Sequence, residues 1–348
     1  MVEAAARIGR TIRGSRSARV TGWLGAAVVV VMFVGCVGTL PYTLGRVSAG
    51  EVRGGEEMQG ALPRRFEATN LDEALLPPSW SPHAADERSR REASEAEGRG
   101  GHHLLGTDRL GRDLLVRCLA GGGISLSIGL AAAFVALLIG TAYGTISGYF
   151  GGRVDAMMMR IVDILYGLPN VLLVVLLAVA VDGLLERAGR DPAPGVRQLI
   201  NVLTLLIAIG SVTWLTMARV IRGQVLSLKR QAFMEACVAT GVPFRRQYFR
   251  HLLPNLLAPI IVYATLTVPT AILSESFLSF LGIGVKEPLP SWGNLAAGGL
   301  NELNIVRSRW WLLLWPCLFI GLALLGLNFV GEGLRESLDP KRRVAGTR

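Results

Sequence analysis

The stretch of this sequence best suited to binding chemistry runs from Glu235 to Asn255, E-A-C-V-A-T-G-V-P-F-R-R-Q-Y-F-R-H-L-L-P-N, between two long apolar runs. Glu235 can make a charge-assisted hydrogen bond to a basic group of another protein. The small side chains of Ala236 and Cys237 allow another surface to approach closely. These residue types predict a contact surface rather than a catalytic centre.

The same stretch is predicted to form two short helices that meet at a sharp corner. Gly241 suits the left-handed residue that follows a helix, and Pro243 suits the first position of the second helix. An apolar face recurs every fourth residue of that second helix, at Phe244, Tyr248 and Leu252. This face fits either a partner's groove or the protein's own inner surface. A basic helical loop lying on the membrane surface is the plainer alternative.

Residue patterns for catalysis, nucleotide binding or metal binding are missing from the sequence. No G-x-x-x-x-G-K-[ST] occurs, and none of Lys229, Lys286 and Lys341 follows a phosphate-cradling glycine loop. The histidines give no zinc spacing, and the adjacent pair His102-His103 is expected to be solvated. The four cysteines are scattered and lack C-x-x-C spacing. We therefore expect no catalytic site, no metal and no cofactor in this chain.

The elements that must position the 235–255 stretch are apolar. Hydrophobic residues make up 51% of the 348 residues, which is typical of a polytopic membrane protein. Runs of about 20 apolar residues cross the hydrocarbon layer as helices. Six such runs are present: Trp23–Leu44, Ile124–Ile146, Ile161–Val181, Leu199–Val220, Leu256–Leu278 and Trp310–Val330. The third is expected to kink at Leu168-Pro169. The predicted fold is an all-α membrane protein with six transmembrane helices.

Basic residues lie on one side of this predicted topology. Segments 1–22, 147–160, 219–255 and 331–348 are each net positive, whereas the segments of the other side are close to neutral in total. Positive loops stay in the cytoplasm, so both termini and the 235–255 stretch are predicted to be cytoplasmic. The net charge of +10 is thereby explained by topology, and no nucleic-acid partner is expected. The first run resembles a signal peptide in part, but its length favours a retained anchor.

The chain is accordingly divided into five parts. They are a cytoplasmic Arg-rich segment 1–22, a first transmembrane helix 23–44, a long external loop 45–117, a five-helix core 118–330 with cytoplasmic helices at 223–255, and a cytoplasmic tail 331–348. Within the loop, the charged residues 86–99 form either a short solvated helix, supported by Glu87/Arg91 and Arg91/Glu95, or a flexible segment.

Polar residues at the edges of the predicted spans are candidates for a transport pathway or gate: Asp108, Arg112, Asp113, Asp163, Glu275 and Trp292. Either Asp108 or Thr107 is expected to cap the helix that follows. Asp163 is expected to pair with Arg160, three residues earlier. Glu275 is expected either to face a water-filled path or to hydrogen-bond a neighbouring Ser in helix packing.

The order Glu235-Ala236, Gly241, Leu253-Pro254 resembles the coupling motif of importer-type ABC transporter membrane subunits. The stretch L-G-T-D-R-L-G-R-D at 105–113 resembles the C-type permease of the dipeptide, oligopeptide and nickel branch, as do P-S-W-G at 290–293 and the chain end at 328–340. Cys237 stands where that family usually has alanine.

The resemblance implies a type I importer permease of a bacterial inner membrane, surrounded by lipid. Its partners would be a second homologous permease, two ATP-binding subunits that hold ATP and Mg, and an external substrate-binding protein. The coupling residues carried over are Glu235, Ala236, Cys237, Gly241, Pro243, Phe244, Tyr248, Leu253 and Pro254.

The cargo stays open at this stage between dipeptides, longer peptides, a nickel chelate and a peptide antibiotic. A different class of protein, an ion-coupled secondary transporter, would show inverted repeats and buried carboxylates near the membrane midplane.

Overall fold

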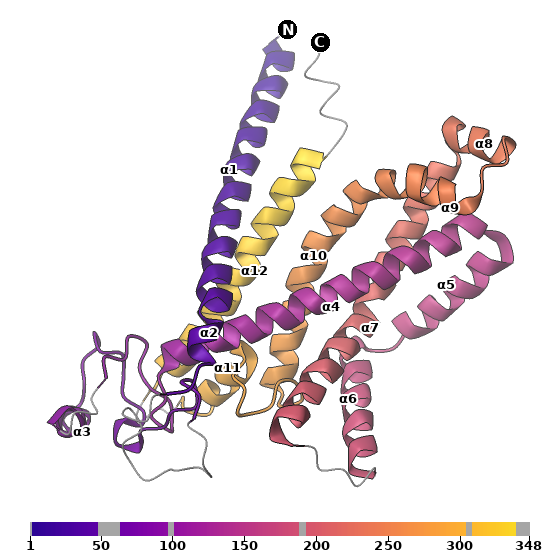
Figure 1. The fold of residues 1–348 in the computed structure, drawn as a ribbon. Helices are drawn as coiled ribbons and strands as arrows, with labels where there is room; N and C mark the ends of the chain where they lie inside the picture. The colour runs from indigo at the N-terminus through magenta and orange to yellow at the C-terminus, as the bar shows by residue number, and fades with distance from the viewer. Residues whose placement is uncertain (1, 48–62, 97–100, 188–192, 304–307, 339–348) are drawn as a thin grey trace.

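The computed structural model describes residues 2–47, 63–96, 101–187, 193–303 and 308–338. Over these residues the chain is helical apart from turns and isolated bridges (Figure 1). The helices are α1 (Val2–Gly38), α2 (Leu40–Thr43), a 3₁₀ turn (Leu71–Glu73), α3 (Ala85–Ala96), α4 (Leu114–Phe150), α5 (Gly152–Tyr166), α6 (Asn170–Arg187), α7 (Pro194–Lys229), α8 (Ala232–Ala239), α9 (Phe244–Gln247), a π-helical turn (Tyr248–Leu252), α10 (Leu253–Phe280), α11 (Trp292–Leu300) and α12 (Trp311–Leu338).

Five helical stretches within the described residues are long and apolar enough to cross a membrane: Val20–Thr43, Leu114–Phe150, Gly195–Lys229, Phe244–Phe280 and Trp311–Ser337. Each corresponds to a predicted span, which confirms the all-α membrane class. Most extend beyond the apolar run that predicted them, because the helix continues into polar turns at its ends. Segment 1–22 is part of α1 from Val2 onward.

The third predicted span consists of two helices, α5 and α6, whose axes meet at 89°. The break falls at Gly167-Leu168-Pro169, where the kink was predicted. Pro169 has no N–H to donate, and its ring disfavours helical backbone at Leu168. The predicted kink at Leu168-Pro169 is therefore confirmed as a sharp break, and the two helices together make the sixth span if the bent pair counts as one.

Glycine allows the two central helices to pack closely. α4 and α7 run against each other along most of their length. A Cβ at Gly144 of α4 would lie 2.4 Å from the carbonyl oxygen of Ala218 on α7, so only glycine fits there. Close approach on small residues is the usual way in which membrane helices associate.

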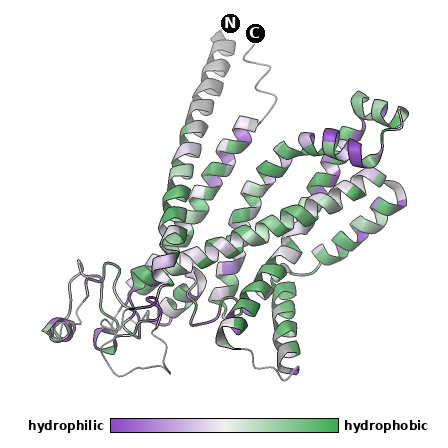
Figure 2. Cartoon of the chain, viewed as in Figure 1, coloured by the Kyte–Doolittle hydropathy of each residue, from purple (hydrophilic) through white to green (hydrophobic). Residues whose placement is uncertain are grey.

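Polar residues gather at the two ends of the helical bundle. Figure 2 shows hydrophobic residues along the lengths of α4, α7, α10 and α12, with hydrophilic residues near α8 and α9 and around α3. The start of α1, the end of α12, the α4–α5 turn and the α8–α9 corner share one end, and α3 and α11 lie towards the other (Figure 1).

The described part of the long loop is folded. α3 forms with the predicted Arg91–Glu95 ion pair, whose atoms lie 2.8 Å apart, so the helical alternative for 86–99 is confirmed over Ala85–Ala96. Residues 63–96 fold onto 101–113, and we call these two segments together the cap. Phe66 and Leu76 are buried within it. Residues 48–62 and 97–100 of the predicted loop lie outside the described residues.

Backbone pairing explains why the cap is ordered. The Leu75 amide donates to the Asp108 carbonyl at 2.9 Å, and the Leu76 amide donates to Thr107 Oγ1 at 2.8 Å. The flexible alternative for 86–99 is therefore wrong over the described residues 86–96, and the external position of the loop stays a prediction.

Candidate functional site

The corner, residues 232–252, is built by one left-handed residue, as the sequence predicted. α8 ends at Ala239, and Gly241 adopts φ +66°. The Gly241 amide donates to Val238 O at 3.1 Å, and the Val242 amide donates to Cys237 O at 3.0 Å. These two bonds satisfy carbonyls that the helix end would otherwise leave unpaired.

The second half of the corner differs from the prediction in two ways. Pro243 is the N-cap of α9 with extended backbone, one residue before the helical position expected for it. α9 is also not a separate helix, because it passes through a π-helical turn directly into α10. Leu253 and Pro254 thus lie inside a continuous helix, and the π-helical turn ends just before Pro254, which has no N–H to donate to the preceding turn.

α8 turns one face to the outside. Glu235, Ala236 and Val238 are exposed, Cys237 is half-buried, and Met234 on the opposite face is buried against the body of the protein. An acidic side chain beside small and apolar ones remains available for another surface.

The apolar face of the second half packs inward. The Phe244 ring lies 4.4 Å from the Tyr149 ring, centroid to centroid, and Leu252 is fully buried in a cluster with Tyr248 and Ile221. Of the two alternatives, these residues therefore cover the protein's own inner surface.

Gln247 fixes the corner to α4, and the sequence analysis missed it. Its Oε1 accepts a hydrogen bond from the Tyr149 hydroxyl at 2.9 Å. Its Nε2 donates to the Val242 carbonyl at 2.6 Å. The side chain is 3% exposed. A signal was present, because Gln247 is a polar residue three positions after Phe244, on the apolar face of the turn.

Two arginine–aspartate pairs connect α5 to α7 at the same end. Arg222 donates to both Asp155 carboxylate oxygens, at 2.5 and 2.6 Å. Arg219 donates to Asp163 at 2.8 Å, and its guanidinium lies 4.1 Å from the Tyr166 ring centre. The predicted Asp163–Arg160 pair is therefore wrong. Arg219, 56 positions away in sequence, is the partner.

At the other end, the N-cap of α4 is Asp113, whose carboxylate accepts from the amides of Leu115 and Val116. The prediction of Asp108 or Thr107 as the N-cap of this helix is therefore wrong. Asp108 pairs instead with Arg112, at 2.7 Å, and with Arg117. Burial opposes its charge, but both arginines outweigh that cost and hold the pKa of Asp108 below its usual range.

Glu287 brings the loop after α10 into this cluster. Its carboxylate lies 3.7 Å from Arg112 and 3.4 Å from Arg117. The charged residues of the 105–113 stretch thus tie the cap to the α10–α11 connection.

His103 is not solvated as expected, although His102 is exposed. Its ring nitrogens lie 2.8 Å from an Asp113 oxygen and 2.9 Å from a Glu73 oxygen. Burial disfavours the charged ring, but the hydrogen bonds and charges of both carboxylates outweigh this and raise the pKa of His103 to about 9. His103 therefore joins the two halves of the cap to the start of α4.

Glu275 and Trp292 are fully buried packing residues in this chain. The Glu275 carboxylate accepts from Ser279 at 2.8 Å, which is the helix-packing alternative. The Trp292 indole N–H donates to the Cys118 carbonyl at 3.0 Å. Any role of either residue in a transport pathway stays a prediction.

Comparison with known proteins agrees with this architecture. The family described as "Binding-protein-dependent transport system inner membrane component" matches residues 121–344. The oligopeptide transport system permease protein OppC of Haemophilus influenzae is 46% identical over 243 residues, 70% of this chain and 72% of that protein. OppC of Escherichia coli K12 is 45% identical over 269 residues, 77% and 82% of the two chains. The dipeptide transport system permease protein DppC of Bacillus subtilis is 42% identical over 270 residues, 78% of each chain.

Proposed function

This chain belongs to the family of binding-protein-dependent transport system inner membrane components, and we propose that it carries di- or oligopeptides across the cytoplasmic membrane of a bacterium. The family's members named above are oligopeptide and dipeptide permease proteins of ABC transporters. Their coverage of more than two thirds of both chains supports the same cargo class here.

In this proposal the corner is the part of the chain on which the ATP-hydrolysing subunit acts. The exposed face of α8, with Glu235 and Ala236, docks on a separate ATP-hydrolysing subunit, and Glu235 contributes a charge-assisted hydrogen bond. The exposure of this polar and small-residue face of α8 is the observation that carries the proposal. The basic segments around it support a cytoplasmic position for the corner and for both termini.

The contacts beneath the corner give the motion a route into the bundle. Gln247 links the corner to Tyr149 at the end of α4. Lys229, at the end of α7, donates to the Tyr149 carbonyl at 2.5 Å. A displacement of the corner therefore moves the adjoining ends of α4 and α7 together.

α5 follows α7 through the Asp155–Arg222 and Asp163–Arg219 pairs. The break at 167–169 then acts as the joint at which α5 turns relative to α6. Such rigid-body movement about a few loop residues is a common way for a protein to switch between two states.

The remaining subunits follow from the family. ATP and Mg are held by two partner ATPase subunits, because this sequence has no phosphate-binding loop. A second homologous permease completes the pathway, and an external binding protein delivers the cargo.

The test uses the assembled transporter in lipid vesicles with labelled dipeptides and oligopeptides. We expect Ala236→Trp to abolish co-purification of the ATPase and peptide uptake, because a large side chain prevents close docking. Leu138→Trp, on the exposed side of α4, is the matched control. Normal uptake by Ala236→Trp would contradict the docking role.

Two other outcomes would identify the alternatives. Uptake of a nickel chelate or a peptide antibiotic without peptide uptake would change the cargo. Uptake driven by an ion gradient in vesicles lacking the ATPase would place the chain among secondary transporters.

A further inference from the structure

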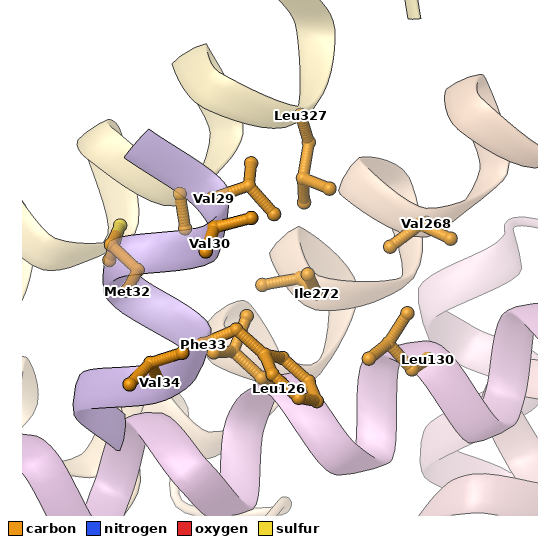
Figure 3. Close-up of a pocket in the computed structure, with 11 residues that line it drawn as sticks. Val29, Val30, Met32, Phe33, Val34, Leu126, Leu130, Val268, Ile272 and Leu327 are labelled. Carbon is orange, nitrogen blue, oxygen red and sulfur yellow. The ribbon is translucent and has the colours of Figure 1, made fainter. Parts of the chain in front are cut away.

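An apolar cavity of about 300 Å³ lies among α1, α4, α10 and α12. Figure 3 shows its side chains pointing into a common space from these four helices. Six of them define its walls: Met32, Phe33, Leu126, Leu130, Ile272 and Leu327. All eleven lining residues are apolar, so the cavity has no group that could orient a polar ligand.

The cavity lies at the depth of the hydrocarbon layer. Residues 29–34 of its α1 wall occupy the middle of the Val20–Thr43 span. Water does not fill a wholly apolar cavity. An empty space, however, deprives the surrounding side chains of dispersion contacts. A hydrocarbon occupant removes this cost.

The cavity can be reached from the side of the bundle. Val30 and Val34 of α1 are 58% and 62% exposed, and Leu130 on the facing wall is 38% exposed. These three exposed residues form the rim of the cavity on the side of the bundle.

The wall chemistry distinguishes a lipid chain from a partner helix. Where α1 and α12 approach most closely, a glycine makes the contact: a Cβ at Gly25 of α1 would lie 2.4 Å from the Phe329 Cβ of α12. Membrane helices generally associate through such small residues. In the cavity only Ala323 is small, and the other lining residues are Val, Met, Phe, Leu and Ile. This irregular wall suits a thin, flexible chain better than a helix.

From this lining, depth and access we propose that an acyl chain of a membrane phospholipid occupies the cavity and seals α1 to α4 and α10. α1 packs mainly on α12 and less on α4, so the lipid extends the smaller of the two contacts of α1. The inference is independent of the cargo and of the docking role of α8.

The first experiment is native mass spectrometry of the assembled transporter with added palmitoyl-oleoyl phosphatidylglycerol. Leu130→Trp fills the cavity from its rim, and Leu138→Trp is the matched control, two turns along the same helix and outside the lining. We expect wild type and Leu138→Trp to retain one phospholipid more than Leu130→Trp, with an affinity at least tenfold higher for that lipid. Equal lipid retention in all three proteins would overturn the proposal.

A second experiment does not depend on how a variant folds around tryptophan. p-Benzoyl-phenylalanine is incorporated at position 34 and photoactivated in native membranes. An adduct with the mass of a phospholipid supports the proposal. An adduct with another protein chain, or no lipid adduct at all, overturns it.

Discussion

Replacing Gln247 with leucine removes two hydrogen bonds with little change in side-chain size: the one that holds the corner to Tyr149 of α4 and the one to Val242 within the corner. Each bond contributes about 0.5–1.5 kcal/mol. The former partners, the Tyr149 hydroxyl and the Val242 carbonyl, belong to half-buried residues, so water can replace part of what is lost. Together we expect the corner to be destabilised by about 1–3 kcal/mol, which corresponds to roughly 5- to 150-fold faster local opening.

Hydrogen–deuterium exchange measures this opening directly. The Gln247 amide donates to the Pro243 carbonyl at 3.0 Å, so a peptide covering residues 241–250 reports on the corner. We expect its exchange to accelerate by the stated factor in Gln247→Leu while the α4–α7 packing keeps its protection. Gln224→Leu, an exposed glutamine of α7, is the matched control.

The functional consequence separates transmission from docking. We expect Gln247→Leu to keep the ATPase bound, because α8 is unchanged, but to lower peptide-stimulated ATP hydrolysis. Unchanged exchange in the 241–250 peptide would refute the reasoning that Gln247 holds the corner. Full stimulation despite faster exchange would refute its part in transmission.

Other residues give predictions of the same kind. Asp155→Arg is expected to lower peptide uptake severalfold and Asp155→Arg with Arg222→Asp to recover most of it, since the double variant restores the α5–α7 pair; equal loss in both would contradict this. Gly241→Val is expected to cost about 1–2 kcal/mol at φ +66° and to weaken ATPase co-purification more than Gly241→Asn, which tolerates that backbone; identical behaviour would exclude backbone strain. The pKa of His103 is raised to about 9, so its contribution to cap stability is complete below about pH 6.5 and is lost as pH rises through 9. Proteolysis of the cap should therefore increase between pH 7 and 10 in wild type but much less in His103→Gln, and a flat wild-type profile would disprove the linkage.

The sequence predicted the class of fold because membrane crossing is a local property. A run of about 20 apolar residues must form a helix in hydrocarbon, whatever surrounds it. Gly241 was likewise predictable, because a left-handed backbone position restricts the residue that occupies it. The helical form of 86–99 was one of two alternatives, and its i, i+4 ion pair was visible in the sequence.

The candidate site depended on partners far away in the chain. Gln247 contacts Tyr149 across 98 positions, and Asp155 contacts Arg222 across 67. Asp163 had an arginine three residues away, yet it pairs with Arg219 because α7 lies against α5. Local spacing offers a nearby partner, and packing selects the actual one.

By itself, the sequence determined the membrane helices, the residue that turns the corner and the residues that break the third span. Only the tertiary structure decided that this break is a right-angled joint, that the cap folds onto the start of α4, and which face of the corner stays free. The physical reason is that helix formation depends on neighbours in the chain, whereas ion pairs, buried hydrogen bonds and exposed faces depend on which helices pack together.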